Sequence, residues 1–396
     1  MIDHEHIALL PAGLHDVLPP DAAHEAGLTE RLIAEFSWCG YERIKTPLVE
    51  FEESLLSGSG VALAKQTFRL MDPVSRRMMG VRSDMTPQIA RIAATRLRKA
   101  PRPLRLCYAG QVLRVTGSQL RPERQFGQVG VELIGSLQPA ADAEVILMGA
   151  RALSRLGVRD LSVDLCVPTL VPTICKSLGL SEREQNDLRQ ALDHKDEAAV
   201  RSACRKAAPL MDWLLSASGP AERAVQILAG LELPESAEPD RRRLIEVVRL
   251  TREAAPEKLV LTVDLTEWRG FEYQTGVSFT FFARDVRGEL GFGGRYRAGS
   301  AQGVAGEPAT GFTLYADTVL RAVPAPAPAR RLFVPVGTSV SATEAWRGGE
   351  WVTVSGLEPV VDLKAEARRL GCDHVLIDGV AVPLGESAVV EKNTPS

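Results

Sequence analysis

Apolar residues recur at helical spacing near the start of the chain and alternate soon afterwards. In residues 21–40 they return about every three or four positions and stop near Gly40, a spacing that predicts a helix. Residues 41–51 alternate as in a strand, and Pro47 interrupts them at a position that suits an edge or an interface. Thr86-Pro87 opens a further helix, because a proline in the first turn gives up no helical hydrogen bond.

Strand-like runs dominate the rest of the first 135 residues. They fall at 67–82, around a polar turn at Asp72-Pro73, and again at 104–115 and 126–134, before a helix expected over about 140–156. Hairpin-like turns join these strands, which is typical of an antiparallel sheet flanked by helices. We therefore predict an α+β fold.

The pattern changes twice more along the chain. Residues 165–255 are rich in Ala, Leu, Arg and Glu with little strand pattern, which predicts a helical insertion. Strands are expected again at 259–264 and 277–283, then a glycine-rich turn at 288–294 and a helix near 310–323.

A Pro- and Ala-rich linker at 324–329 separates the last part of the chain, since such a stretch is extended and semi-rigid. We place a core domain at 1–323 and a small C-terminal α/β unit at 330–396. In the C-terminal unit we expect strand, strand, helix (362–370), strand and a polar tail.

The composition is that of a globular protein: 45% of the 396 residues are hydrophobic and 24% are charged. The net charge of −3 lacks the basic excess typical of nucleic-acid-binding proteins. No apolar run approaches the roughly 18–20 residues that cross a bilayer, and the N-terminus has no signal-peptide pattern. We expect a soluble, cytoplasmic protein with no membrane contact. The scattered cysteines and histidines, without a C-x-x-C pair, predict neither a metal nor a redox site.

Polar residues cluster where alternation would place core residues. Arg82, Asp84 and Thr86 stand between a strand end and a helix start, where they can hold a small zwitterion or its ammonium group, although taken alone they are ordinary helix-capping chemistry. Gln128 and Glu132 share one face of a strand, and Arg114 lies on the preceding strand. A carboxylate beside an amide can receive an ammonium or an imidazole; a solvated sheet face is the alternative.

A third segment, 264–297, combines an arginine with closely spaced glycines. Arg269-Gly270 is followed by aromatic residues and then by Gly291-Phe292-Gly293-Gly294-Arg295-Tyr296. An arginine can pair with a carboxylate through two parallel hydrogen bonds, and glycines let a backbone approach a ligand closely. Such glycine runs are also common in turns.

Together these segments resemble the core of class II aminoacyl-tRNA synthetases, and specifically histidyl-tRNA synthetase. The matches are Gly13-x-x-Asp16-x-x-Pro19, the motif 1 proline at Pro47, Arg82-x-Asp84-x-Thr86 with Asp in place of Glu, the motif 2 strands from Arg114 and from Arg124 to Glu132, Arg269-Gly270-x-x-Tyr273-x-Thr275-Gly276, and Gly293-Gly294-Arg295-Tyr296. The resemblance covers about residues 10–323.

The resemblance implies a histidine-binding pocket and no metal or cofactor. Its residues would be Asp84, Thr86, Arg114, Gln128, Glu132, Arg269, Tyr273 and Tyr296. In this arrangement Arg269 would take the α-carboxylate, Asp84, Thr86 and Gln128 the α-ammonium, and Glu132 the imidazole. Gln274 replaces the family's tyrosine on the imidazole side, so we expect moderate affinity.

The departures from the synthetase pattern concern ATP. The E-R-P loop that grips ATP is replaced by Thr116, Gly117 and Ser118, and in motif 3 Tyr315 and Thr318 stand where the family has glycine and arginine. Adenylate formation needs cations arranged around phosphates. We therefore predict that this chain has no catalytic residues and forms no adenylate.

The C-terminal unit lacks the charge of an anticodon-binding domain. Its 67 residues carry seven Lys and Arg against nine Asp and Glu, a net charge of −2, and a tRNA-binding module should be basic. The basic stretch 91–105 is the exception elsewhere in the chain. It is either a solvated face or a docking surface for an acidic partner or for phosphates.

A synthetase-like chain that keeps the amino-acid pocket and loses ATP and tRNA chemistry is similar to a paralogous family, the regulatory subunits of short-form ATP phosphoribosyltransferase. That resemblance implies an allosteric, non-catalytic subunit, a homodimer within a hetero-oligomer. Its partners would be the short catalytic subunit and free L-histidine, but not tRNA. The complex would perform the first step of histidine biosynthesis under feedback inhibition by histidine. The alternative is a divergent histidine–tRNA ligase.

Overall fold

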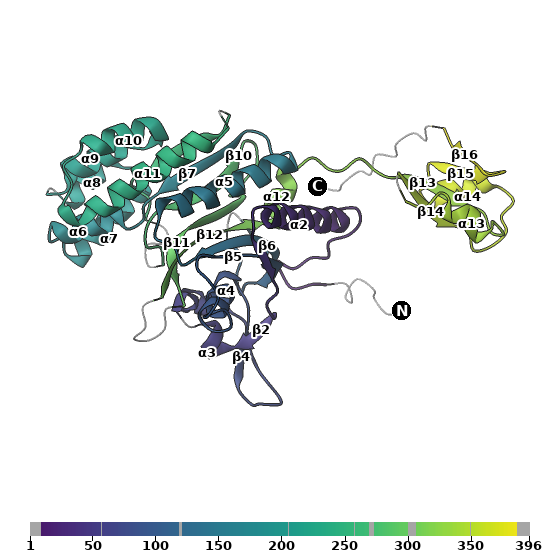
Figure 1. Ribbon diagram of the computed structural model, residues 1–396, viewed down its shortest axis with the longest axis horizontal. Coiled ribbons are helices and arrows are strands. Elements are labelled where there is room, and N and C mark those ends of the chain that lie inside the picture. Colours follow the sequence, from purple (N-terminus) through teal and green to yellow (C-terminus); the bar gives the residue numbers. More distant parts are fainter. Residues whose placement is uncertain are drawn as a thin grey trace. The chain divides into compact units, whose positions relative to one another are not determined.

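The computed structural model describes residues 9–56, 58–118, 121–204, 206–256, 258–268, 273–299, 306–348 and 350–385. The chain divides into two compact units, Met1–Pro324 and Ala325–Ser396 (Figure 1). Each unit has its own buried core. Within the described residues no helix is both long and apolar enough to span a membrane.

A nine-stranded sheet in the described part of the first unit carries the fold. Its order is β1 (Glu42–Ile44), β5 (Leu104–Leu113), β6 (Gln125–Ile134), β12 (Glu307–Tyr315), β11 (Gly291–Ala298), β10 (Ser278–Ala283), β7 (Leu161–Cys166), β9 (Val260–Asp264), β8 (Gly219–Pro220). The pairs from β5 through β7 are antiparallel, whereas β1–β5 and β7–β9 are parallel. The predicted α+β class with a mainly antiparallel sheet is confirmed.

Two long helices, α2 (Asp21–Trp38) and α5 (Pro139–Leu156), cover one face of this sheet. Phe36 of α2 packs edge-on against Phe312 of β12, which packs in the same way against Phe281 of β10. Gly149 of α5 meets the Phe281 ring, and a Cβ at this glycine would overlap it. This tight contact sets α5 directly on the sheet.

The opposite face holds the helix α4 (Thr86–Ala94) and a second core cluster. Along β5 and β6 the residues alternate between the two faces, with Cys107 and Val131 in the core under α2 and α5, and Tyr108 in the core under α4. Beside α4 lie α3 (Glu52–Leu55), the 3-10 helix η1 (Gly58–Gln66) and a three-stranded sheet of β2 (Val49–Phe51), β4 (Met78–Val81) and β3 (Arg69–Met71).

Helices fill the region between β7 and β9. They are α6 (Leu170–Ser177), α7 (Glu182–Asp193), α8 (Glu197–Ala203), α9 (Ala208–Ala217), α10 (Ala221–Gly230), η2 (Glu235–Ala237) and α11 (Glu238–Ala254). Ser181 and Glu184 form a reciprocal capping box at the start of α7, which satisfies two backbone donors there. After β12 a short helix, α12 (Ala316–Ala322), ends the unit.

The second unit is a small α/β fold. Its sheet order is β14 (Trp351–Ser355), β13 (Arg330–Val334), β15 (His374–Ile377), β16 (Val380–Pro383), with the first three strands parallel and the last antiparallel. The helices are α13 (Val340–Glu344) and α14 (Leu363–Arg369).

Two predicted elements were wrong. Gly291 to Gly294 begin strand β11 and do not form a turn, because the absent side chains let β11 approach the backbone of β12. Residues 310–315 belong to strand β12, and only α12 remains of the helix expected at 310–323. Pairing with β6 and β11 on both sides outweighs local helical spacing there.

Candidate functional site

A cavity of about 200 Å³ opens on the face of the sheet that α4 covers. It is lined from four directions: the start of α4 (Thr86), the segment after Phe271 (Tyr273), strand β11 (Tyr296) and the centre of the sheet (Glu132). Several glycines of β11 and β12, Gly293, Gly294 and Gly311, form part of its wall. The antiparallel pairing of β6, β12 and β11 therefore sets the shape of the cavity.

Glu132 is a buried carboxyl group in the cavity wall. Tyr296 donates its hydroxyl to Oε2 at 2.9 Å, and Tyr108 donates to Oε1 at 3.3 Å. Burial raises the pKa of Glu132 to about 8, although the hydroxyl donors oppose the shift. Near pH 7 the group is therefore largely protonated. Gly311 faces it across the sheet, where a Cβ would overlap Oε2.

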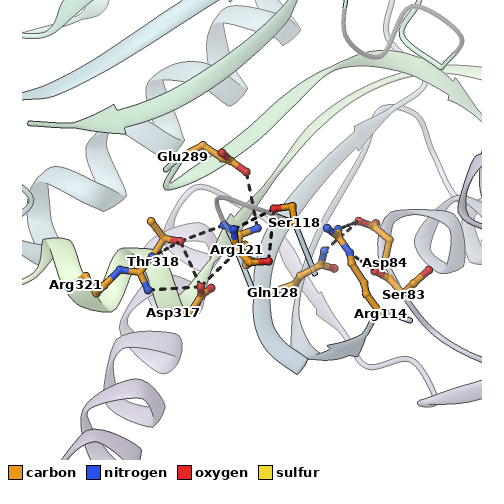
Figure 2. A network of polar contacts seen from close by, with 10 residues as sticks. All are labelled: Ser83, Asp84, Arg114, Ser118, Arg121, Gln128, Glu289, Asp317, Thr318 and Arg321. Atoms are coloured by element: carbon orange, nitrogen blue, oxygen red, sulfur yellow. Dashed lines mark hydrogen bonds and ion pairs between the residues drawn. The ribbon is translucent and has the colours of Figure 1, made fainter. Parts of the chain in front are cut away.

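Asp84 is held in place by its neighbours. Its Oδ1 accepts from the backbone N–H of Thr86 at 2.9 Å, and its Oδ2 accepts from Gln128 Nε2 at 3.0 Å (Figure 2). The Gln128 amide oxygen in turn accepts the backbone N–H of Met85 at 3.0 Å. Arg114 approaches Asp84 at 4.0 Å and also lines the cavity. The cavity thus has a carboxylate and a guanidinium at one end and the Glu132 carboxyl group further in.

The eight residues implied by the synthetase resemblance do not all line the cavity. Six line the cavity: Asp84, Thr86, Arg114, Glu132, Tyr273 and Tyr296. Gln128 is not among the lining residues, and with both ends of its amide engaged it orients Asp84. Arg269 lies outside the described residues. The rings of Tyr273 and Tyr296 stack at 5.1 Å and 24°.

Sequence reasoning missed Tyr108 and Thr313. The Tyr108 hydroxyl lies 2.8 Å from Thr313 Oγ1 and 3.2 Å from Thr86 Oγ1, besides its contact with Glu132. The available signal was Gly130, which stands opposite Tyr108 in the β5–β6 register and whose missing side chain leaves room for the phenol.

Comparison with known proteins gives the family. The histidyl-tRNA synthetase family model matches residues 13–319. The ATP phosphoribosyltransferase regulatory subunit of Rhodospirillum centenum is 62% identical over 94% of this chain and 95% of its own length. That of Paramagnetospirillum magneticum is 56% identical over 95% of this chain and 98% of its own length. This chain belongs to the family of ATP phosphoribosyltransferase regulatory subunits.

Two solved structures have the same fold as this chain. A Bacillus halodurans protein described as ATP phosphoribosyltransferase regulatory subunit/histidyl-tRNA synthetase matches with a TM-score of 0.77 and 26% identity, over 91% of this chain and 96% of that one. The histidyl-tRNA synthetase of Nostoc matches with a TM-score of 0.75 and 18% identity, over 93% and 91%, which shows the fold alone.

Arg82 was expected beside Asp84 in the amino-acid contact, but its side chain binds the protein's own backbone. It is buried and donates to the backbone oxygens of Gln111 at 2.7 Å and Thr46 at 3.1 Å. It therefore joins strand β5 to the segment between β1 and β2. Its position close against Gly110 leaves no space for a Cβ there.

The basic stretch 91–105 is partly neutralised within the chain. Arg91 pairs with Glu50, Arg102 with Glu307 and Arg105 with Glu144. Arg96, Arg98 and Lys99 are exposed. In the part of the chain that the structure describes, no group of three His, Cys, Asp or Glu side chains could hold a metal ion.

Proposed function

We propose that this chain is the non-catalytic regulatory subunit of ATP phosphoribosyltransferase in the cytoplasm, and that it acts with a short catalytic chain. The name shared by its full-length relatives supports a regulatory role. The observation that carries the proposal is the cavity around Glu132, which is lined by six of the residues that the resemblance assigns to histidine binding.

Free L-histidine is the ligand that best fits the cavity. Asp84 and Thr86 would bind its ammonium group, and Glu132 its imidazole. Arg114, and Arg269 by resemblance, would bind its carboxylate. A protonated Glu132 donates to a ring nitrogen and an ionised one accepts from it, so either form can pair with imidazole. Feedback inhibition then requires that histidine bind one state of the complex more tightly than another.

The residues around motif 3 support the proposed loss of adenylate chemistry. Tyr315 and Thr318 are both buried, and the guanidinium of Arg121 donates to Thr318 Oγ1 at 3.1 Å. The same guanidinium faces Asp317 and Glu289, so its charge is already balanced and is not available to phosphates. We expect no histidine-dependent exchange of pyrophosphate into ATP by the pure protein. Exchange clearly above background would favour the histidine–tRNA ligase instead.

We also propose a homodimer within the hetero-oligomer. Apolar side chains that a monomer would leave in water include Trp38 at the end of α2, Leu48 beside Pro47, and Met71, Val74 and Met78 on the β3–β4 hairpin. Sedimentation at micromolar concentration should give the mass of a dimer. A monomer at that concentration would contradict this proposal.

The regulatory role is tested by phosphoribosyl-ATP formation. The cognate short catalytic chain is assayed alone, with this protein, and with this protein plus histidine. We expect the two chains to elute together, turnover to rise on mixing, and histidine to lower it. Co-elution with no change in rate would refute the regulatory role. If the two chains form no complex, the proposal that the short catalytic chain is the partner is refuted.

A further inference from the structure

Arg121 is a buried arginine that the histidine cavity does not use. It lies in the loop 114–124 between β5 and β6, and its side chain is only 8% exposed. Ser118 and Arg121 are joined by two hydrogen bonds: Ser118 N donates to the Arg121 carbonyl at 2.6 Å, and Arg121 N donates to Ser118 Oγ at 3.0 Å. The Arg121 side chain points toward Glu289, Asp317 and Thr318 (Figure 2).

The guanidinium lies between aromatic rings and carboxylates. It is 3.5 Å from the centre of the Tyr315 ring and 5.0 Å from that of Phe126, and these rings meet edge-on. It donates to Thr318 Oγ1 at 3.1 Å and to Asp317 Oδ2 at 3.4 Å, and Glu289 is 3.8 Å away. The groups around it form what we call the guanidinium box: Phe126, Glu289, Tyr315, Asp317 and Thr318.

The shape and the donors of a guanidinium suit this box better than those of other cations. A planar cation stacks on an aromatic face, and its forked N–H groups can reach a hydroxyl and two carboxylates together. An ammonium would satisfy only part of this set. Asp317 Oδ1 is buried and has no hydrogen-bond partner among the described residues, so the box has acceptor capacity left.

The box is mechanically linked to the histidine cavity through one ring. Two guanidinium groups, those of Arg121 and Arg114, each lie 5.0 Å from the centre of the Phe126 ring. Arg114 lines the cavity, donates to the Ser83 carbonyl at 3.4 Å and lies 4.0 Å from Asp84. The Phe126 ring therefore lies against both Arg121 and a charged residue that lines the cavity.

We infer that the guanidinium box is a binding site for a guanidinium group, occupied from within the chain by Arg121, and that this occupancy positions Arg114 for the cavity ligand. Arg121 is then a positioning residue that touches no ligand. The second half of this inference rests on the proposed binding of histidine, whereas the first half does not.

Removal of the side chain and its replacement by a small molecule test the box. In Arg121→Ala the box is empty, and calorimetric titration should detect binding of methylguanidinium at millimolar concentration. The wild type should bind none there. Arg321→Ala is the matched control, because Arg321 approaches the same Asp317 at 3.8 Å and Thr318 at 3.3 Å but is half exposed. Absence of methylguanidinium binding to Arg121→Ala, or equal binding to Arg321→Ala, would overturn the box.

Histidine titration tests the positioning role. We expect Arg121→Ala to bind histidine about tenfold more weakly, the loss of roughly one ordered ionic contact, and methylguanidinium to restore much of the affinity. A purely structural defect would not be repaired by this small cation. Unchanged histidine affinity in Arg121→Ala would overturn the positioning role while leaving the box.

Two further arms keep the outcomes separate. If Arg121→Ala does not fold, Arg121→Lys keeps the charge and length but not the planar fork. It should show the same loss of histidine affinity, and wild-type affinity in this variant would overturn the inference. If the wild type binds no histidine, the proposed ligand and the positioning role both fail, and the methylguanidinium titration decides the box alone.

Discussion

Glu132 lies in the centre of the sheet, where two phenol groups and Gly311 leave little space around its carboxyl group. Because burial raises its pKa to about 8, the folded protein keeps a proton that the unfolded chain releases above about pH 4.5. The same group is thus both the main polar feature of the cavity and a source of pH-dependent stability.

The sign of that dependence can be measured. The free energy of unfolding should fall as pH rises from about 4.5 to about 8, with a slope of at most ~1.4 kcal/mol per pH unit from this group, and then level off. Glu132→Gln should flatten this window in urea unfolding, whereas Glu246→Gln on the exposed face of α11 should not. A wild-type stability that rises through this window, with an unchanged slope in Glu132→Gln, would contradict a protonated Glu132.

Arg269 is the residue whose role depends on the family resemblance alone. If it takes the α-carboxylate, Arg269→Ala should weaken histidine binding by about 1.5–3 kcal/mol, the range for a hydrogen bond to a charged group. Calorimetric titration measures this directly, with Arg287→Ala as a control that removes an arginine from the turn after β10. Equal histidine affinity in wild type and Arg269→Ala would refute the assignment.

Some residues of the site could be predicted from the sequence, and others could not. The period of two along β6 placed Gln128 and Glu132 on one face, and both are buried on the side of α4. The same spacing could not tell a lining residue from one that orients its neighbour, because that depends on the backbone N–H of Met85. Arg121 had no signal in the sequence, since Tyr315, Asp317 and Glu289 meet it only after the sheet has formed.

At the scale of elements, a buried ion pair joins strand β11 to helix α5. Arg295 follows the glycines of β11 and donates through Nε to Asp142 of α5 at 3.0 Å, and both side chains are nearly fully buried. Arg243 of α11 adds a second contact to Asp142 at 3.2 Å. One carboxylate therefore connects the cavity wall and the helical region between β7 and β9 with α5.

Removal of that carboxylate would leave a buried cation unpaired. We expect Asp142→Ala to lower the free energy of unfolding by about 3–5 kcal/mol, because the desolvation of Arg295 is no longer offset. Urea unfolding measures the change. Loss of Glu246, which pairs with Arg249 on an exposed surface, should leave stability nearly unchanged. A small effect of Asp142→Ala would show that water reaches Arg295.

Long elements with consistent periodicity were predictable, and elements set by pairing were not. The helices α2 and α5 and the strands β5 and β6 lie within a few residues of their expected ranges. By contrast, Thr310 to Tyr315 carry local signals for a helix but lie between β6 and β11, where both edges of the backbone are hydrogen-bonded. The glycines of β11 were predicted to form a turn, because their actual role, a close approach to the backbone of β12, is evident only once the partner strand is in place.

At the scale of the whole molecule, the two units have separate cores. Phe333, Ala367 and Val375 belong to the core of the C-terminal unit, and among the described residues its buried clusters are built from that unit's own side chains. The cavity, the guanidinium box and Asp142 all lie in the unit Met1–Pro324. The proposed histidine site should therefore be complete without the C-terminal unit.

A chain that ends at Pro324 tests this independence. Its main unfolding transition should stay within a few degrees of the same transition in the full chain, because the described buried residues of the first unit's core lie before Pro324. Its histidine affinity should also match that of the full chain. Differential scanning calorimetry and histidine titration on both forms measure the two quantities, and mixing with the short catalytic chain then shows whether the acidic C-terminal unit contributes to docking. If truncation lowers the transition by well over 10 °C or abolishes histidine binding, the C-terminal unit is part of the folded core and the division at Pro324 does not describe separate folding units.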